Sequence, residues 1–239
     1  MSDALPALPS GPVSSIDEVI DRKVAIAAAL PVTDGVACFN RLYLTVTREV
    51  QARIGTGFYR DPAFVSRLDV VFANIYFAAI DDWNGNRKAV PRSWAVLIRR
   101  RQDDGLAPLQ FALAGMNAHI NHDLPVAVVE TCRQLGTAPQ KGAHEADYEK
   151  VNELLGDLEP AIQESFEEGI LLELDRQFAG IDNLAATFSI KAAREVAWNN
   201  ALTLWSLRDQ RFLSRPFLDG LDRLVAFAGR SLLLPLPRI

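Results

Sequence analysis

The chain has 239 residues, enough to bury a sizeable core, and its 49% hydrophobic and 23% charged fractions are those of an ordinary globular protein. A net charge of -5 argues against a nucleic-acid surface, and the one basic cluster, residues 99–101, is interpreted as a solvated helix end. Two cysteines, Cys38 and Cys132, are too few for a disulfide framework and are expected to be buried thiols.

The first 14 residues contain three prolines and no basic segment, so they are expected to form a flexible lead-in and not a signal peptide. No apolar run reaches the ~18 uninterrupted residues of a membrane span. We therefore expect a cytoplasmic protein with no membrane partner and no nucleic-acid partner.

Helical signals follow one another from residue 15 onward. Ser15 and Glu18 form a capping box that opens a first helix, and a second is predicted from about Asp34 through VACFNRLYLTVTREVQARI. Asp61-Pro62 starts a third, AFVSRLDVVFANIYFAAI, which is apolar on nearly every side. This third helix is predicted to lie at the centre of the fold.

The second half of the chain is also predicted to be helical. Pro91 opens one helix, and the next, from about Pro108 to Gly136, is expected to break or kink at Pro125. Further helices are predicted near 147–158, 160–178 and 183–208, and a last one from about Pro216. No alternating strand pattern and no fixed repeat interrupts them, so residues 15–239 are predicted to form one all-α domain of nine to ten helices around a central apolar helix.

The segment AGMNAHINHDLP, residues 114–125, gathers two of the three histidines with two asparagines and an aspartate. No charged side chain occurs from residue 105 to its first histidine, so the helix is predicted to be buried all round. At 100° per residue, His119 and Asp123 lie on one flank of the helix and Asn117 and Asn121 on the other, while His122 points further out.

Three interpretations of this segment stay open. In the structural one, Asp123 caps the helix that restarts at Pro125, and His119 and the amides satisfy backbone groups. In the acid–base one, Asp123 orients the His119 imidazole as general base or acid, and Asn117 and Asn121 hold polar groups of a substrate. In the third, His119 and Asp123 bind a divalent metal with another carboxylate, although the glutamate of metalloprotease motifs is missing.

Other residues are candidates for the same space. Asp69 is the only charge between Leu68 and Ile80 of a very apolar helix and needs a partner, and Tyr76 follows it on the same face. Arg194 and Trp198 share a helical face; Arg194 is a natural counter-ion for Asp69 or for an anionic substrate, and Trp198 is more typical of a core. His144 lies in an expected loop and is predicted to be at the surface.

Four blocks resemble a bacterial, all-helical family of uncharacterised function: RLYLTVTREV, LDVVFANIYF, PLQFALAGMNAHINHDLP and AWNNALTLW. The resemblance spans roughly residues 39–208 and implies that Asp69, Asn117, His119, Asn121 and Asp123 belong to the family pattern, with His122 at a variable position. It favours a His119–Asp123 pair over a metal-binding His-x-x-His, and it implies no activity.

The leading hypothesis is a small-molecule enzyme that uses acid–base chemistry in a helix-walled pocket, for hydrolysis or for a cofactor-free cyclisation or isomerisation. No phosphate loop, nucleophile elbow or dinucleotide fingerprint is present, so no cofactor is expected. The alternatives are a metal-dependent hydrolase through His119, Asp123 and Asp69, and a non-catalytic ligand-binding or structural protein. The expected catalytic residues are His119, Asp123 and Asp69, and the expected substrate-binding residues are Asn117, Asn121, Tyr76, Arg194 and Trp198.

Overall fold

The computed structural model describes the backbone of residues 4–167 and 189–237, with side chains outside 157–167. This part of the chain contains nine α-helices and one π-helical segment and no strand, so the predicted all-α single domain is confirmed. Its elements are α1 (Ile16–Ala29), α2 (Gly35–Arg53), α3 (Pro62–Gly85), α4 (Arg92–Arg100), α5 (Pro108–Ala118), η1 (His119–Asp123), α6 (Leu124–Gln134), α7 (His144–Glu167), α10 (Ile190–Ser206) and α11 (Arg211–Leu232).

The helix starts follow the capping residues of the sequence. Ser15, Asp34 and Asp61 each accept a hydrogen bond from a backbone N–H in the first turn that follows. The C-terminal half differs from the prediction in detail. One helix, α7, replaces the pair predicted at 147–158 and 160–178, and α11 begins before Pro216, which lies in its second turn. Residues 168–178 and 183–188 of the predicted helices lie outside the described residues.

Helix α3 is the predicted central apolar helix, and it packs against α1, α6, α7 and η1. By length and composition alone it could also cross a membrane, but 61% of its most apolar stretch is buried inside the protein. A helix that is apolar all round is expected in the middle of a domain, because no face of it is left for water.

The lead-in before α1 lies against α3. Asn74, Asp81 and Asn84 of α3 accept hydrogen bonds of 2.8–3.0 Å from its backbone, and Leu5 is buried. Residues 4–14, expected to be flexible, are thus held by side-chain-to-backbone contacts that composition alone does not reveal. The prolines keep this segment extended, so its N–H groups are free to donate to the amide and carboxylate side chains of α3.

The basic cluster at the end of α4 is not a solvated helix end throughout. Arg101 is 3% exposed and forms an ion pair with the buried Asp34 at the start of α2. It also donates to the carbonyl of Ala4, at 2.5 Å. The planar guanidinium suits such a buried, multiply bonded position, so this residue ties α4 to α2 and the lead-in.

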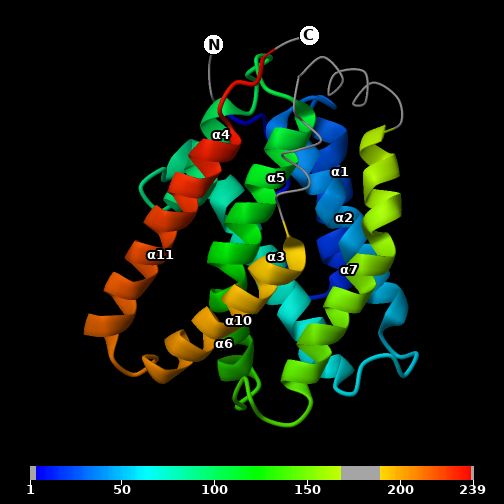
Figure 1. Cartoon of the computed structure of the whole chain (residues 1–239), viewed down its shortest axis with the longest axis vertical. Helices are drawn as coiled ribbons and strands as arrows, with labels where there is room; N and C mark the ends of the chain where they lie inside the picture. The colour runs from blue at the N-terminus through cyan, green and yellow to red at the C-terminus, as the bar shows by residue number, and fades with distance from the viewer. Residues whose placement is uncertain (1–3, 168–188, 238–239) are drawn as a thin grey trace.

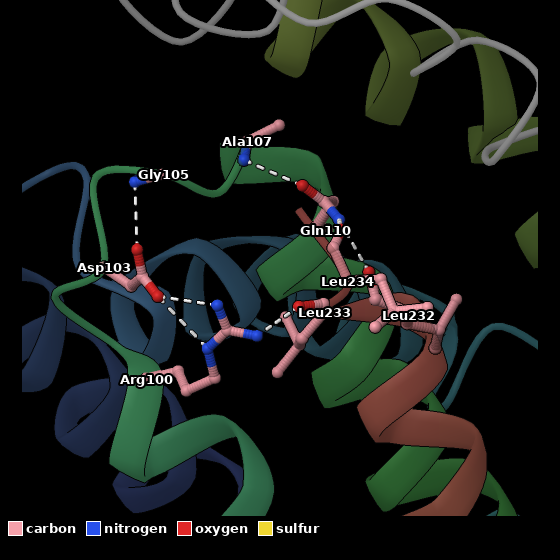
Figure 2. A network of polar contacts seen from close by, with 8 residues as sticks. All are labelled: Arg100, Asp103, Gly105, Ala107, Gln110, Leu232, Leu233 and Leu234. Atoms are coloured by element: carbon pink, nitrogen blue, oxygen red, sulfur yellow. Dashed lines mark hydrogen bonds and ion pairs between the residues drawn. The ribbon is translucent and has the colours of Figure 1, made fainter. Parts of the chain in front are cut away.

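Figure 2 shows a second group of polar contacts made by this region; these contacts hold the C-terminal end of α11. Arg100 pairs with Asp103 at 2.7 Å and donates to the carbonyl of Leu233. Gln110 donates to two more carbonyls of the same segment, at 2.7 and 2.8 Å. These bonds satisfy carbonyls that a helix end leaves without partners, and they fix α11 against the start of α5.

Helix α5 lies between α11 and α2 in the middle of the bundle (Figure 1). Gly115 allows the close approach to α2, because a Cβ atom at this position would lie 2.4 Å from the ring of Phe39. Every residue of α5 except Leu109 is buried. The small residues of the motif therefore bring its polar residues into the centre of the domain, as the sequence predicted.

Candidate functional site

The motif forms a widened helical turn. Helices α5 and α6 do not break at Pro125 but continue through η1, in which the N–H of Leu124 bonds the carbonyl of His119 five residues earlier. Pro125 has no N–H, and its ring would clash with the carbonyl four residues before it in a regular α-helix. The π-helical turn relieves this conflict, and single π turns inside α-helices are frequent at functional sites.

His119 and Asp123 form the core of the site. The Nδ1 atom of His119 lies 3.0 Å from Oδ2 of Asp123, and Trp94 Nε1 donates to the same oxygen at 2.8 Å. His122 Nδ1 lies 2.7 Å from Oδ1, so His122 turns toward Asp123 and is mostly buried instead of pointing outward. Asp123 makes no side-chain cap to α6, which contradicts the capping role of the structural interpretation.

Burial and hydrogen bonding act in opposite directions on this pair. Burial lowers the pKa of His119 to about 4, although the bond to Asp123 raises it, and Lys23 lowers it further. Burial would raise the pKa of Asp123, but hydrogen bonds from His119 and His122 bring it below its ordinary value. At neutral pH the carboxylate is therefore ionised and accepts the Nδ1–H of a neutral imidazole, whose buried Nε2 has no hydrogen-bond partner.

Aromatic rings surround the His119 imidazole. Phe72 of α3 stacks on it face to face, with 3.5 Å between centroids and 7° between planes, and Tyr43 of α2 lies edge-on at 4.4 Å. Three more rings have centroids 5.5–6.0 Å away: Phe39, Tyr76 and Trp94. Such a shell keeps water away from the imidazole, which is the physical cause of its low pKa.

His119 lines a cavity of about 90 Å³ between α2, α3, α7, α10 and the α5–η1–α6 rod. A water molecule needs roughly 10–15 Å³ of such space, so the cavity has room for several waters or for part of a small molecule. Its lining residues are Phe39, Leu42, Tyr43, Val46, Val50, Val65, Leu68, Asp69, Phe72, Met116, His119, Ile120, Leu124, Val151, Leu155, Ile190 and Arg194. Asp69, His119 and Arg194 are the charged or imidazole members of this otherwise apolar or aromatic wall.

Asp69 lies on the same face of α3 as Phe72, one turn earlier. It is 8% exposed, and its buried Oδ2 has no hydrogen-bond partner. Burial raises the pKa of this carboxyl to about 6, and the attraction of Lys23 only partly opposes the increase. Arg194, expected as its counter-ion, is not among the charges that act on it.

Lys23 of α1 is a charged neighbour of the candidate site that sequence reasoning missed. It is fully buried, donates a hydrogen bond to Thr47, and holds its Nζ 2.9 Å from the ring centroid of Tyr43. Burial places the pKa of its amine well below the ordinary value. Tyr43 thus stands between this lysine and His119. The sequence does indicate its burial, because Lys23 shares a helix face with the apolar residues Val19 and Ile26, four residues before it and three after it. All three are buried.

Asn117 and Asn121 do not reach the cavity. Asn121 Nδ2 donates to Asn117 Oδ1 at 3.2 Å, and Asn117 Nδ2 donates to the carbonyl of Val225 on α11 at 2.9 Å. The two residues stack one turn apart, as predicted, but the flank that they share faces α11 and not the lining of the cavity. Their contacts hold α11 to the central rod.

The other expected substrate-binding residues divide in two. Arg194 lines the cavity, whereas Tyr76 and Trp198 are not part of its wall. Tyr76 lies behind it, fully buried, with its hydroxyl 3.4 Å from Asn40 Oδ1. Trp198 packs on α7 and donates to Glu145 at 2.9 Å, as the core interpretation of this residue predicted.

His144 is not at the surface, and that prediction was wrong. It begins α7, is 5% exposed and stacks on Phe64 with 4.1 Å between centroids. Its Nε2 lies 3.3 Å from a carboxylate oxygen of Asp61, and its Nδ1 lies 2.9 Å from the carbonyl of Ala138. The loop expected here ends earlier because this stacking joins the start of α7 to the start of α3. Cys38 and Cys132 are buried thiols, as expected.

The alternative metal set is not assembled. Within the described parts of the chain, no three histidine, cysteine, aspartate or glutamate residues are grouped so that they could hold a metal ion. Asp123 directs its oxygens to His119, His122 and Trp94, and Asp69 does not join them as a third ligand. The donor atoms therefore do not fit the metal site that the sequence left open.

Comparison with known proteins gives one finding. No curated protein and no solved structure matches the chain. The profile of one protein family matches residues 16–235, from the first turn of α1 to beyond the end of α11, and so includes every residue that lines the cavity. The chain belongs to this family, which is described as a family of unknown function, DUF5995.

Proposed function

We propose that the cavity is the site of a small-molecule enzyme that transfers protons within an apolar substrate without a cofactor. One observation carries the proposal: a neutral, buried imidazole lies in the wall of an apolar cavity, and its Nε2 has no partner in the protein. A buried polar atom that lacks a partner costs free energy unless it is used, so such an atom in a cavity wall is a candidate for catalysis.

His119 is proposed as the general base. Asp123 accepts its Nδ1–H, which fixes the tautomer with the lone pair on Nε2, and it stabilises the imidazolium when a proton is taken up. Trp94 holds the carboxylate from the other side by a 2.8 Å bond. These groups lie on packed helices, so the imidazole is oriented before a substrate binds.

Asp69 is proposed as the acid. A carboxyl with a pKa of about 6 exchanges its proton close to neutral pH, and its protonated form can donate to a substrate oxygen in an apolar site. His119 Nε2 removes a proton from the carbon next to a carbonyl, the C–H electrons move to the carbonyl oxygen, and Asp69 protonates it. If the substrate carries a β,γ double bond, the product of this step is a dienol; return of the first proton from His119 to its γ-carbon, and of the hydroxyl proton to Asp69, gives the α,β-unsaturated isomer.

The composition of the wall supports isomerisation or cyclisation over hydrolysis. The described part of the lining offers no serine, threonine or cysteine as a nucleophile, and its apolar residues favour an apolar substrate over water. N-A-H-I-N-x-D-L-P is proposed as the core motif of the family, with His119 and Asp123 serving the reaction and Asn117 and Asn121 holding α11.

The test is catalysed exchange of α-protons in D2O, followed by proton NMR, with decan-2-one as the apolar carbonyl probe. We expect the protein to accelerate exchange over buffer, with a rate that falls as the pH drops through the pKa of His119. His119→Gln should abolish the acceleration, because glutamine can still donate to Asp123 but cannot act as a base.

His122→Gln is the matched control. His122 also bonds Asp123 but is not part of the cavity wall, so its variant should keep the activity. Exchange by His119→Gln at the wild-type rate would refute the role of this imidazole. Binding of the ketone with no exchange by the wild-type protein would favour the non-catalytic ligand-binding alternative.

A further inference from the structure

Arg194 carries a buried charge that has no carboxylate partner among the described residues. The residue is 6% exposed, and no carboxylate of the described residues forms an ion pair with it; its electrostatic partners are Tyr148 and Tyr59. Two of its nitrogens are used by neutral acceptors: Nε donates to Asn152 at 2.6 Å and Nη2 to the carbonyl of Tyr148 at 2.8 Å. A buried cation is costly unless an anion compensates it.

The position of this guanidinium is fixed by the protein and not by a ligand. It lies over the ring of Tyr148, 4.2 Å from the centroid, and the Tyr148 hydroxyl donates in turn to the carbonyl of Arg194. These contacts orient the fork before anything enters the cavity. Arg194 is one of the lining residues, so the positive charge belongs to the same cavity as His119 and Asp69.

We infer that the ligand of this cavity is an amphipathic monoanion, an aliphatic carboxylate whose head group binds Arg194 and whose chain occupies the apolar space toward His119. The inference rests on the proposed function in one respect, that this cavity is the substrate site. It adds the chemical class of the substrate.

The chemistry of the wall selects this class. Among the residues that the structure describes, Nη1 is the one guanidinium nitrogen without an acceptor, so the site offers one charged donor. One charged donor suits a carboxylate, whereas a phosphate group attracts several cations. Aliphatic side chains form most of the remaining surface, among them Val46, Val50, Val65, Leu68 and Ile120. Such a wall binds hydrocarbon by removing its apolar surface from water.

The experiment measures binding by isothermal titration calorimetry at pH 8, with decanoate as the anionic probe and decan-1-ol as its neutral counterpart. We expect decanoate to bind the wild-type protein at least tenfold more tightly than decan-1-ol. Arg194→Met should remove this difference by weakening decanoate alone, and Arg194→Lys should keep part of it because the charge remains.

Arg208→Met is the matched control, since Arg208 also lies over an aromatic ring, 4.5 Å from the centroid of Trp205, but outside the cavity. Equal affinity of the wild-type protein for the two probes, or unchanged decanoate binding by Arg194→Met, would overturn the inference. If Arg194→Met fails to fold, the wild-type comparison and the lysine variant decide. Tight decanoate binding by a wild-type protein that catalyses no proton exchange would uphold this inference and refute the proposed function, so the two failures are distinguished.

Discussion

Removal of the Asp69 charge should change how the stability of the protein depends on pH. The pKa of Asp69 is raised from 3.8 to about 6, and that of His119 is lowered from 6.5 to about 4. At ~1.36 kcal/mol per pKa unit, each shift corresponds to about 3 kcal/mol in the free energy of unfolding. The two contributions have opposite signs over nearly the same pH range.

The signs follow from proton binding. Between pH 3.8 and 6 the folded state binds more protons than the unfolded state at Asp69, so this contribution to stability is complete below 3.8 and is lost as the pH rises through 6. Between pH 6.5 and 4 the unfolded state binds more protons at His119, so that contribution is complete above 6.5 and is lost as the pH falls through 4. These two contributions to the wild-type free energy of unfolding therefore nearly cancel across this range.

In Asp69→Asn, of these two contributions only that of His119 remains. The free energy of unfolding of this variant should therefore fall by about 3 kcal/mol from pH 6.5 to pH 4 relative to wild type. His119→Gln should show the opposite slope. Urea denaturation at half-unit pH steps, followed by circular dichroism, measures both, and Asp209→Asn, at an exposed carboxyl, should parallel the wild-type curve. Parallel curves for Asp69→Asn and wild type would refute the reasoning.

Lys23→Met tests the same electrostatics from behind the cavity wall. The ammonium lowers the pKa of both Asp69 and His119, so its removal should raise both values. NMR titration of the His119 ring protons and the Asp69 carboxyl carbon measures the shifts. Thr47→Val removes the hydrogen-bond acceptor of Lys23 but keeps the charge, so it should leave both pKa values nearly unchanged. If Lys23→Met left both pKa values unchanged, Lys23 would only pack against Tyr43 and its charge would not act on the site.

Two further variants test the frame of the site. Gly115→Ala places a methyl group 2.4 Å from the Phe39 ring, so it should lower the free energy of unfolding by about 1–3 kcal/mol in urea titrations. Gly156 lies at an open helical position, so Gly156→Ala should leave the free energy of unfolding unchanged or raise it by up to ~1 kcal/mol. Equal effects of the two would contradict the close packing of α5 on α2. Trp94→Phe removes the 2.8 Å hydrogen bond to Asp123, so it should lower the free energy of unfolding by about 1–2 kcal/mol, which is measured as a lower melting temperature. An unchanged melting temperature would show that this hydrogen bond adds no stability.

The fold could be predicted because its determinants are local. Side chains at Ser15, Asp34 and Asp61 cap the following helix in the structure as their positions in the sequence indicate. The spacing of His119 and Asp123 likewise predicts their contact, since residues four apart share a helix face. Even the irregularity near Pro125 follows from a proline inside an apolar helix, although its form, a π turn and not a break, depends on the packing of α6 against α3 and α10.

The composition of the cavity could not be predicted, because it is assembled from five separate segments. Lys23, Tyr43 and Phe72 surround the site from three different helices, and nothing local in the sequence indicates that they meet. The two asparagines have the predicted spacing, but which neighbouring helix their flank faces is decided by tertiary packing. Sequence periodicity assigns a residue to a face of its own helix, and the element that meets this face is a property of the whole domain.

The widened turn at η1 makes the length of the central rod as important as its residue types. A π turn accommodates one more residue than an α turn, so deletion of a single residue between Ala118 and Leu124 closes it to an ordinary α turn and brings back the clash of Pro125 with the preceding turn. A deletion within α5 has no such turn to absorb it and rotates the rest of the rod by about 100°. The side chains that α6 presents to α3 and α10 would then face the wrong way. Point substitutions can alter the chemistry of this pocket gradually, whereas a change in the length of the rod before the turn would disturb half of the domain at once.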